Sequence, residues 1–208
     1  MQTPLKDRAR RLLDPLVELL ARARVSPAAV TVAGLGFAAG AGALVAGGRL
    51  RAGALCLILS ALSDVVDGQL ARRAGRAGPF GAFLDSCLDR LGEGAVFLGL
   101  ALHFGPAGAR YVALAIVALI GSTMVSYARA RAEGLGLHGQ VGVLERPERL
   151  ALLIVGLLLG GRWLVGILAG LTGLAFLTFG ARVRHVGRQV RAAGAGRPAR
   201  AEKAGAAR

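Results

Sequence analysis

The chain has 208 residues, of which 54% are hydrophobic and only 18% charged, and its 26 Lys and Arg against 12 Asp and Glu give a formal net charge of +14. Soluble domains have about a quarter of their residues charged, so this composition disfavours a soluble nucleic-acid-binding protein, and its hydrophobicity excludes a disordered chain. Two cysteines are too few for a disulfide-stabilised scaffold. The composition therefore predicts a small polytopic membrane protein with basic ends.

Six segments are apolar enough to be interpreted as transmembrane helices, each of which needs about 20 mostly apolar residues. In chain order they cover residues 27–46, 50 to about 70, about 80–104, 109 to about 130, 147–160 and 163 to about 180. The sequence thus predicts an all-α integral membrane protein, with a six-helix transmembrane domain at residues 26–185. Glycines four residues apart are expected to allow close helix packing; they are Gly36 and Gly40, Gly156 and Gly160, and Gly166 and Gly170.

The two ends of the chain are predicted to lie outside the bilayer. Residues 1–25 place leucines near one face and basic side chains elsewhere, which is typical of an amphipathic juxtamembrane helix in the membrane interface. A soluble helical arm is the alternative, and Asp14–Pro15 is expected to break the helix in two. Residues 186–208 are rich in Ala, Gly and Arg and are predicted to form a basic disordered tail.

Most of the basic residues fall on one predicted side of the membrane. They lie in residues 1–25, 71–80 and 129–149 and from Arg182 onward. Because cytoplasmic loops carry an excess of Lys and Arg, the pattern predicts a multi-pass protein of the cell membrane with both termini in the cytoplasm.

Four aspartates lie inside or at the edge of predicted spans, where ionisable groups are costly and are candidates for function. Asp64 and Asp67 are three residues apart, and Asp85 and Asp89 are four apart, so each pair falls on one face of its helix. A short turn joins the two helices. We therefore expect the pairs to face each other across a helical hairpin near the cytoplasmic surface.

Four converging carboxylates repel one another unless protons or cations compensate them. Protons would suit a relay, whereas an all-carboxylate set favours Mg²⁺ or Mn²⁺, with room for two ions. Two adjacent divalent ions suit phosphoryl chemistry, and Arg72 could neutralise a phosphate. The alternative is that the carboxylates are simply paired with Arg72, Arg73 and Arg90.

The full spacing is Asp64-x2-Asp67-Gly68-x2-Ala71-Arg72-x8-Gly81-x3-Asp85-x3-Asp89. It resembles, without a gap, the signature of the CDP-alcohol phosphotransferases. The resemblance implies six transmembrane helices, an active site facing the cytoplasm, a homodimer, and metal binding by all four aspartates with Asp89 also the general base. It further implies that the CDP-diacylglycerol donor contacts Thr31, Gly68, Ala71, Arg72 and Gly78, the last standing where relatives often have Ser or Thr.

The second half of the chain carries a set of cations that suits an acceptor with its own phosphate, although ordinary charge flanking the spans is the alternative. These cations are Arg129, Arg131, Arg146, Arg149 and Arg182. The segments 126–133 and 145–149 resemble the phosphatidylinositol phosphate synthases of actinobacteria. This resemblance implies transfer of a phosphatidyl group from CDP-diacylglycerol to inositol 1-phosphate, with release of CMP. The implied acceptor-phosphate residues, near the carboxylates, are Ser126, Arg129, Arg131, Arg149 and Arg182, with Arg129 at a position where relatives often have Lys.

Other functions remain open at the level of the sequence. A phosphatidylglycerophosphate synthase would use glycerol 3-phosphate, and an archaeal-type archaetidylinositol phosphate synthase would use an ether lipid. A transporter using the buried acids and a catalytically inactive scaffold are alternatives from other classes, and the intact aspartate motif disfavours both. No nucleic-acid partner is expected.

Overall fold

The computed structural model describes residues 4–75, 78–142 and 144–195, and within them the chain is helical and contains no strand. The elements are α1 (Pro4–Arg22), α2 (Pro27–Ala46), α3 (Leu50–Arg73), α4 (Pro79–Phe104), the 3₁₀ turn η1 (Gly105–Ala107), α5 (Ala109–Gly134), α6 (Arg146–Leu159) and α7 (Gly161–Ala195). The all-α class is therefore confirmed.

Four helices, α2, α3, α5 and α7, are long and apolar enough to cross a membrane. α4 is not among them, and its first half contains the charged residues Asp85, Asp89 and Arg90. α6 has 14 residues, or about 21 Å at 1.5 Å per residue, which is less than the hydrocarbon core of a bilayer. The count of six spans thus stays a prediction.

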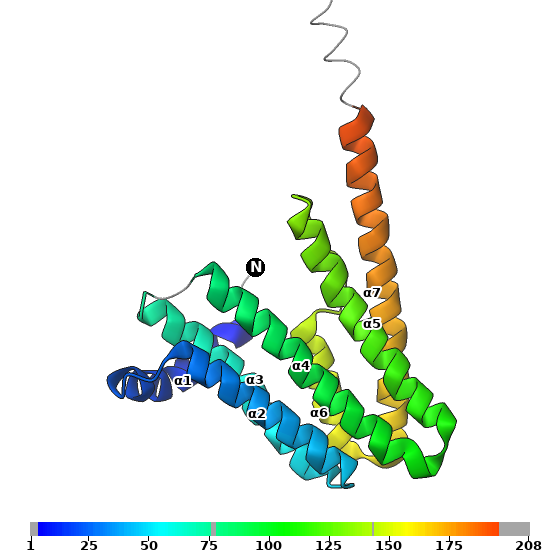
Figure 1. Ribbon diagram of the computed structural model, residues 1–208, viewed down its shortest axis with the longest axis horizontal. Helices are drawn as coiled ribbons and strands as arrows, with labels where there is room; N and C mark the ends of the chain where they lie inside the picture. Colours follow the sequence, from blue (N-terminus) through cyan, green and yellow to red (C-terminus); the bar gives the residue numbers. More distant parts are fainter. Residues whose placement is uncertain (1–3, 76–77, 143, 196–208) are drawn as a thin grey trace, which may run out of the picture.

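Consecutive helices from α2 to α7 run in opposite directions, and the connections after α2, α4 and α6 lie at the same end of the bundle (Figure 1). α2 packs on both α3 and α4, α5 packs on α4 and α7, and α6 lies against α3 and α7. α3 and α4, although consecutive, are held together mainly through α2 rather than by direct contact. The expected hairpin is therefore splayed, which leaves space between its two helices.

Glycines bring α2 and α4 unusually close together. A Cβ atom added to Gly99 would lie 2.1 Å from the carbonyl oxygen of Gly42, and one added to Gly42 would lie 2.3 Å from that of Ala95. These are not the glycines that the spacing selected. Four of the glycines selected by spacing have open space around them, since an added Cβ would meet no described atom within 4 Å. They are Gly36, Gly40, Gly166 and Gly170. Of that set, Gly156 does pack closely, because a Cβ added to it would lie 3.1 Å from Cδ1 of Leu164.

Two predictions about the ends of the chain differ from the structure. α1 is one continuous helix through Pro15, so the predicted break is wrong. Contacts with α3 hold its second half: Arg73 donates to Asp14, and the buried Val17 packs against Val66 and Leu70. Whether α1 lies in the membrane interface stays a prediction.

At the other end, α7 continues to Ala195, into the segment predicted to be disordered. Residues 186–195 are mostly Ala, Gly and Arg without proline, and Ala and Arg favour a helix. The side chain of Gln189 also exchanges two hydrogen bonds with the backbone of His138. The remainder of the predicted tail, residues 196–208, lies outside the described residues.

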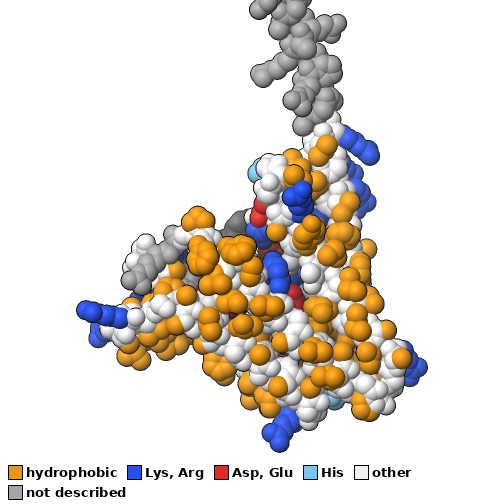
Figure 2. Space-filling view, viewed as in Figure 1, with side chains coloured by type: hydrophobic (Ala, Val, Ile, Leu, Met, Phe, Trp, Pro, Cys, Tyr) orange, Lys and Arg blue, Asp and Glu red, His pale blue; other side chains and the backbone are white. Residues whose placement is uncertain are grey.

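The outer surface of the bundle is largely apolar. Figure 2 shows hydrophobic side chains over most of the visible face, with basic side chains mainly toward the ends. Leu98, Leu102, Ile116, Ile120 and Leu177 are among the exposed side chains. An apolar surface of this extent is unusual for a soluble monomer and agrees with a membrane protein.

Candidate active site

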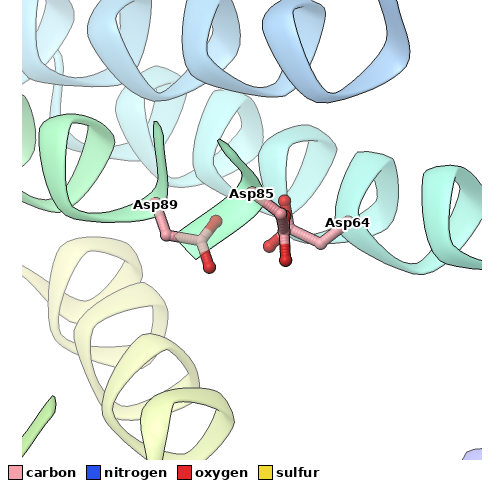
Figure 3. Close-up of side chains that lie close together, drawn as sticks. All are labelled: Asp64, Asp85 and Asp89. Atoms are coloured by element: carbon pink, nitrogen blue, oxygen red, sulfur yellow. The ribbon is translucent and has the colours of Figure 1, made fainter. Parts of the chain in front are cut away.

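Three aspartates from two helices meet at the space between α3 and α4 (Figure 3). Asp64 comes from α3, and Asp85 and Asp89 come from α4; one carboxylate oxygen from each lies within 4.8 Å of the other two. The convergence that the spacing predicts is therefore present for these three side chains.

Asp67, the fourth aspartate of the motif, lies one turn further along α3 and is 7% exposed. Its Oδ2 atom and Oδ1 of Asp85 are buried and have no hydrogen-bond partner among the described residues. A buried carboxylate oxygen left unpaired costs free energy, so these two atoms suit an additional cationic partner. The donor set, carboxylates without His or Cys, is the kind that Mg²⁺ and Mn²⁺ prefer. The residues thus fit a divalent metal site.

Arg146 contributes a positive charge to this cluster. Its Nη1 atom lies 2.7 Å from Oδ2 of Asp64, and its Nη2 atom lies 2.7 Å from Oδ1 of Asp89. Arg146 is the first residue of α6, whose start is fixed by Pro147 and by a 3.0 Å hydrogen bond from the backbone of Glu145 to the carboxylate of Glu148. The beginning of α6 therefore places a guanidinium group across both carboxylate-bearing helices.

The alternative interpretation pairs the carboxylates with Arg72, Arg73 and Arg90. The structure pairs them with a different arginine. Arg73 pairs with Asp14, and Arg90 donates to the backbone oxygen of Ser86. Arg72 is exposed. Pairing does occur, but through Arg146, which lies outside the motif and which the sequence predicts only as one of the cations of the second half, with no assigned contact.

One cavity joins the carboxylates to a second arginine. Its polar lining includes Asp64, Asp89, Glu93, Arg146 and Arg149. Apolar side chains from α2, α3, α4, α6 and α7 complete it, and they are Leu35, Ala38, Leu57, Leu88, Val96, Phe97, Leu150, Leu153 and Leu171. A ligand in this cavity would contact both carboxylates and guanidinium groups, surrounded by apolar side chains.

Arg149 is buried in this cavity, with only 3% of the residue exposed. Its Nη2 atom donates to Oγ of Ser126 at 2.9 Å, and its Nε atom lies 3.5 Å from Oε1 of Glu93. Ser122 donates a hydrogen bond to the same oxygen of Glu93. Glu93, which the sequence analysis missed, thus connects α4 to α5 and α6.

The family of the chain follows from comparison with known proteins. The model of the family described as CDP-alcohol phosphatidyltransferase matches residues 24–180. The chain belongs to this family. The phosphatidyltransferase match covers α2 to α6, most of α7, and every residue of the cavity.

Curated relatives of this phosphatidyltransferase come from bacteria and archaea. It is 41% identical over 149 residues to a phosphatidylinositol phosphate synthase of Mycolicibacterium smegmatis, covering 70% of this chain and 67% of the relative. It is 36% identical over 189 residues to that of Cutibacterium acnes, covering 86% and 91%. An archaetidylinositol phosphate synthase of Methanothermobacter thermautotrophicus is 40% identical over 151 residues, with 73% and 74% covered.

Solved structures agree with this placement. The phosphatidylinositol phosphate synthase of Mycobacterium tuberculosis with CDP-diacylglycerol bound superposes with a TM-score of 0.79 at 32% identity, covering 85% of this chain and 94% of that one. The same enzyme in complex with manganese and citrate gives a TM-score of 0.78, covering 83% and 87%.

The residues predicted to contact the donor are only partly gathered at the cavity of the phosphatidyltransferase. Thr31 lines it and is 8% exposed. Gly68 and Ala71 lie further along α3, Arg72 is exposed near its end, and Gly78 caps the start of α4. Their contacts with a donor stay predictions.

The residues predicted to bind the acceptor phosphate are also divided. Arg149 lines the cavity and is bonded to Ser126, but Arg129 pairs with Glu133 at 2.9 Å and Arg131 is exposed. Arg182 is 2% exposed and donates to the backbone oxygens of Val125 and Val141. Of the four predicted arginines, the structure therefore brings only Arg149 to the carboxylates.

Proposed function

We propose that the protein transfers the phosphatidyl group of CDP-diacylglycerol to inositol 1-phosphate, forming phosphatidylinositol phosphate and CMP with two divalent ions, Mg²⁺ or Mn²⁺. One observation carries the proposal: a single cavity is lined both by Asp64 of α3 and Asp89 of α4, which belong to the carboxylate cluster, and by Arg149. Carboxylates suit the ions, and a buried arginine suits a phosphate on the acceptor. The names of the relatives support the same reaction.

The proposed arrangement in the membrane has six spans, α2 to α7, with α1 in the interface and both termini in the cytoplasm. It is supported by the positions of the basic residues, which lie mainly at the end of the bundle that carries the aspartates. In this arrangement residues 26–185 are the catalytic domain in the cell membrane, and the active site faces the cytoplasm. A homodimer is proposed from the resemblance alone; light scattering on the purified protein would test it.

The diphosphate of the donor would be bound through the metal ions, and we assign metal binding to Asp64, Asp67, Asp85 and Asp89. The ions, when bound, would neutralise the diphosphate and polarise its phosphorus–oxygen bonds. The donor itself would be held by residues along α2, α3 and the start of α4, namely Thr31, Gly68, Ala71, Arg72 and Gly78. Thr31 has the strongest support from the structure, because it already lies in the cavity.

For the chemical step, we assign the general base to Asp89. Its carboxylate accepts the proton of the acceptor hydroxyl, whose oxygen forms a bond to the β-phosphorus while the bond from that phosphorus to CMP breaks. CMP leaves with the electron pair. A carboxylate in an ion pair is a weaker base, so the contact between Asp89 and Arg146 has to loosen before this step.

For the acceptor, Arg149 is the residue we assign to the phosphate, positioned by Ser126 and Glu93. The remaining predicted residues, Arg129, Arg131 and Arg182, would add positive charge around it. Inositol 1-phosphate satisfies such a site, whereas free inositol would leave the buried guanidinium without an anion other than Glu93.

The experiment is a CMP-release assay with purified protein in detergent micelles, Mg²⁺ and CDP-diacylglycerol. We expect release with inositol 1-phosphate and none with free inositol. Release with glycerol 3-phosphate alone would instead identify a phosphatidylglycerophosphate synthase and refute the proposed acceptor. Because one relative is an archaetidylinositol phosphate synthase, the ether-linked donor CDP-archaeol is tested in parallel to define the lipid.

A further inference from the structure

Arg146 contacts two of the same carboxylates that the proposed metal ions require. Both of its Nη atoms are engaged, at 2.7 Å each, with Asp64 on α3 and Asp89 on α4. The bridge therefore joins the two helices that pack mainly on α2 rather than on each other. A guanidinium group is suited to such a bridge because it is planar and presents several donors.

We propose that Arg146 is an internal cation that holds the carboxylate site together without metal and is displaced from it when divalent ions bind. The inference rests on the proposed function for the existence of the metal site, but it concerns only the contacts of Arg146. It predicts that metal ions and this side chain compete for the same two aspartates.

Charge makes the two states mutually exclusive. Without ions, three aspartates converge, with Asp67 one turn away on α3, and Arg146 is the one cation that the described residues show paired with any of them, namely Asp64 and Asp89. With two divalent ions, the four negative charges are already balanced, and a guanidinium in contact with the same oxygens would repel the ions. The arginine is therefore favourable in the first state and unfavourable in the second.

The position of Arg146 allows the movement. Its side chain is 34% exposed, whereas that of Arg149 is 3% exposed, so Arg146 is the less confined of the two. It stands at the first residue of α6, and Arg149 lies three residues later on the same face of that helix. On leaving the aspartates, the guanidinium can remain in the cavity beside Arg149, on the side where the proposed function places the phosphate of the acceptor.

The test measures Mn²⁺ binding and thermal unfolding of the full-length protein in detergent micelles, without donor or acceptor. Free Mn²⁺ is followed by electron paramagnetic resonance in the wild type and in Arg146→Gln. We expect the variant to bind Mn²⁺ about tenfold more tightly, equivalent to about 1.4 kcal/mol. We also expect its Tm to fall in EDTA but to match the wild type in saturating Mn²⁺, because both effects express one coupling free energy.

Two further variants separate displacement from a general effect of charge. Arg90→Gln removes a neighbouring cation of α4 whose guanidinium donates to the backbone of Ser86 instead of bridging aspartates, so it is expected to raise Mn²⁺ affinity much less than Arg146→Gln does. Arg146→Lys keeps the charge but reaches one carboxylate at a time, so its affinity should fall between those of the wild type and Arg146→Gln.

Three outcomes would overturn the inference. The first is an equal loss of Tm in Arg146→Gln with and without Mn²⁺, which would show that the arginine keeps its contacts in the metal-bound state. The second is the same gain in affinity in Arg90→Gln. The third is unaltered Mn²⁺ affinity in both Arg146 variants. Because the assay contains no acceptor, failure of the proposed inositol phosphate reaction would leave these results interpretable.

Discussion

Replacing Arg149 by Ala tests the acceptor half of the proposed site. The guanidinium is held by Ser126 and Glu93 and is the one predicted phosphate-binding arginine that lines the cavity. A hydrogen bond to a charged group contributes about 1.5–3 kcal/mol, and about 1.4 kcal/mol corresponds to a factor of ten. We therefore expect the KM for inositol 1-phosphate to rise about 10- to 150-fold, with a much smaller change in the KM for CDP-diacylglycerol.

The assay is CMP release with one substrate varied while the other is saturating. Equal increases in both KM values would refute the assignment of Arg149 to the acceptor. Arg110→Ala, at the opposite end of α5, removes a cation that stacks on Tyr111 and should change neither value.

The same substitution also has a cost in stability that must be separated from binding. Losing Arg149 leaves the carboxylate of Glu93, whose side chain is 16% exposed, without its positive partner. Breaking a buried ion pair on one side costs about 3–5 kcal/mol. The double variant Arg149→Met with Glu93→Gln removes both charges, so we expect it to recover the Tm while keeping the raised KM for the acceptor. Recovery of both would show that Arg149 acts only on folding.

Three more predictions concern the base, the metal and the packing of α2 on α4. Asp89→Asn keeps the shape of the side chain but cannot accept the proton, so CMP release should fall at least about 100-fold while the purified variant still unfolds cooperatively on heating; substantial remaining turnover would contradict the assignment. Excess EDTA should abolish CMP release and added Mg²⁺ or Mn²⁺ should restore it, and activity that survives chelation would argue against a metal site. Gly99→Ala should cost about 1–3 kcal/mol by overpacking and lower the Tm, whereas Gly94→Ala on the same helix meets no described atom within 4 Å and should not; equal Tm values would refute the close contact at Gly42.

The sequence was most informative where a local pattern decides the structure. The spacing of Asp64, Asp85 and Asp89 sets which helix faces they occupy, and the three carboxylates do converge. Helix limits were also close, since apolar blocks end at Gly, Pro or charged residues; α2, predicted at residues 27–46, spans Pro27–Ala46.

Contacts between distant segments could not be predicted in this way. Arg146 reaches an aspartate 82 residues earlier in the chain, and periodicity contains no information about such a pairing. Arg182 is predicted to bind the acceptor phosphate from its charge and from the resemblance, and neither indicates its two hydrogen bonds to backbone oxygens. Among so many glycines, spacing alone did not select Gly42 and Gly99, because only the crossing point of α2 and α4 makes them necessary.

The length of α7 has a consequence for how the enzyme can vary. Its C-terminal half holds the segment between α5 and α6 at two places, through Arg182 at Val141 and through Gln189 at His138, and that segment leads directly to Arg146 and Arg149. The residues proposed to hold the donor, in contrast, lie on α2, α3 and the start of α4. Shortening or fusing the C-terminus should therefore alter acceptor preference more than donor recognition. Acceptor diversity within one helical scaffold is therefore expected to be encoded far from the aspartate motif.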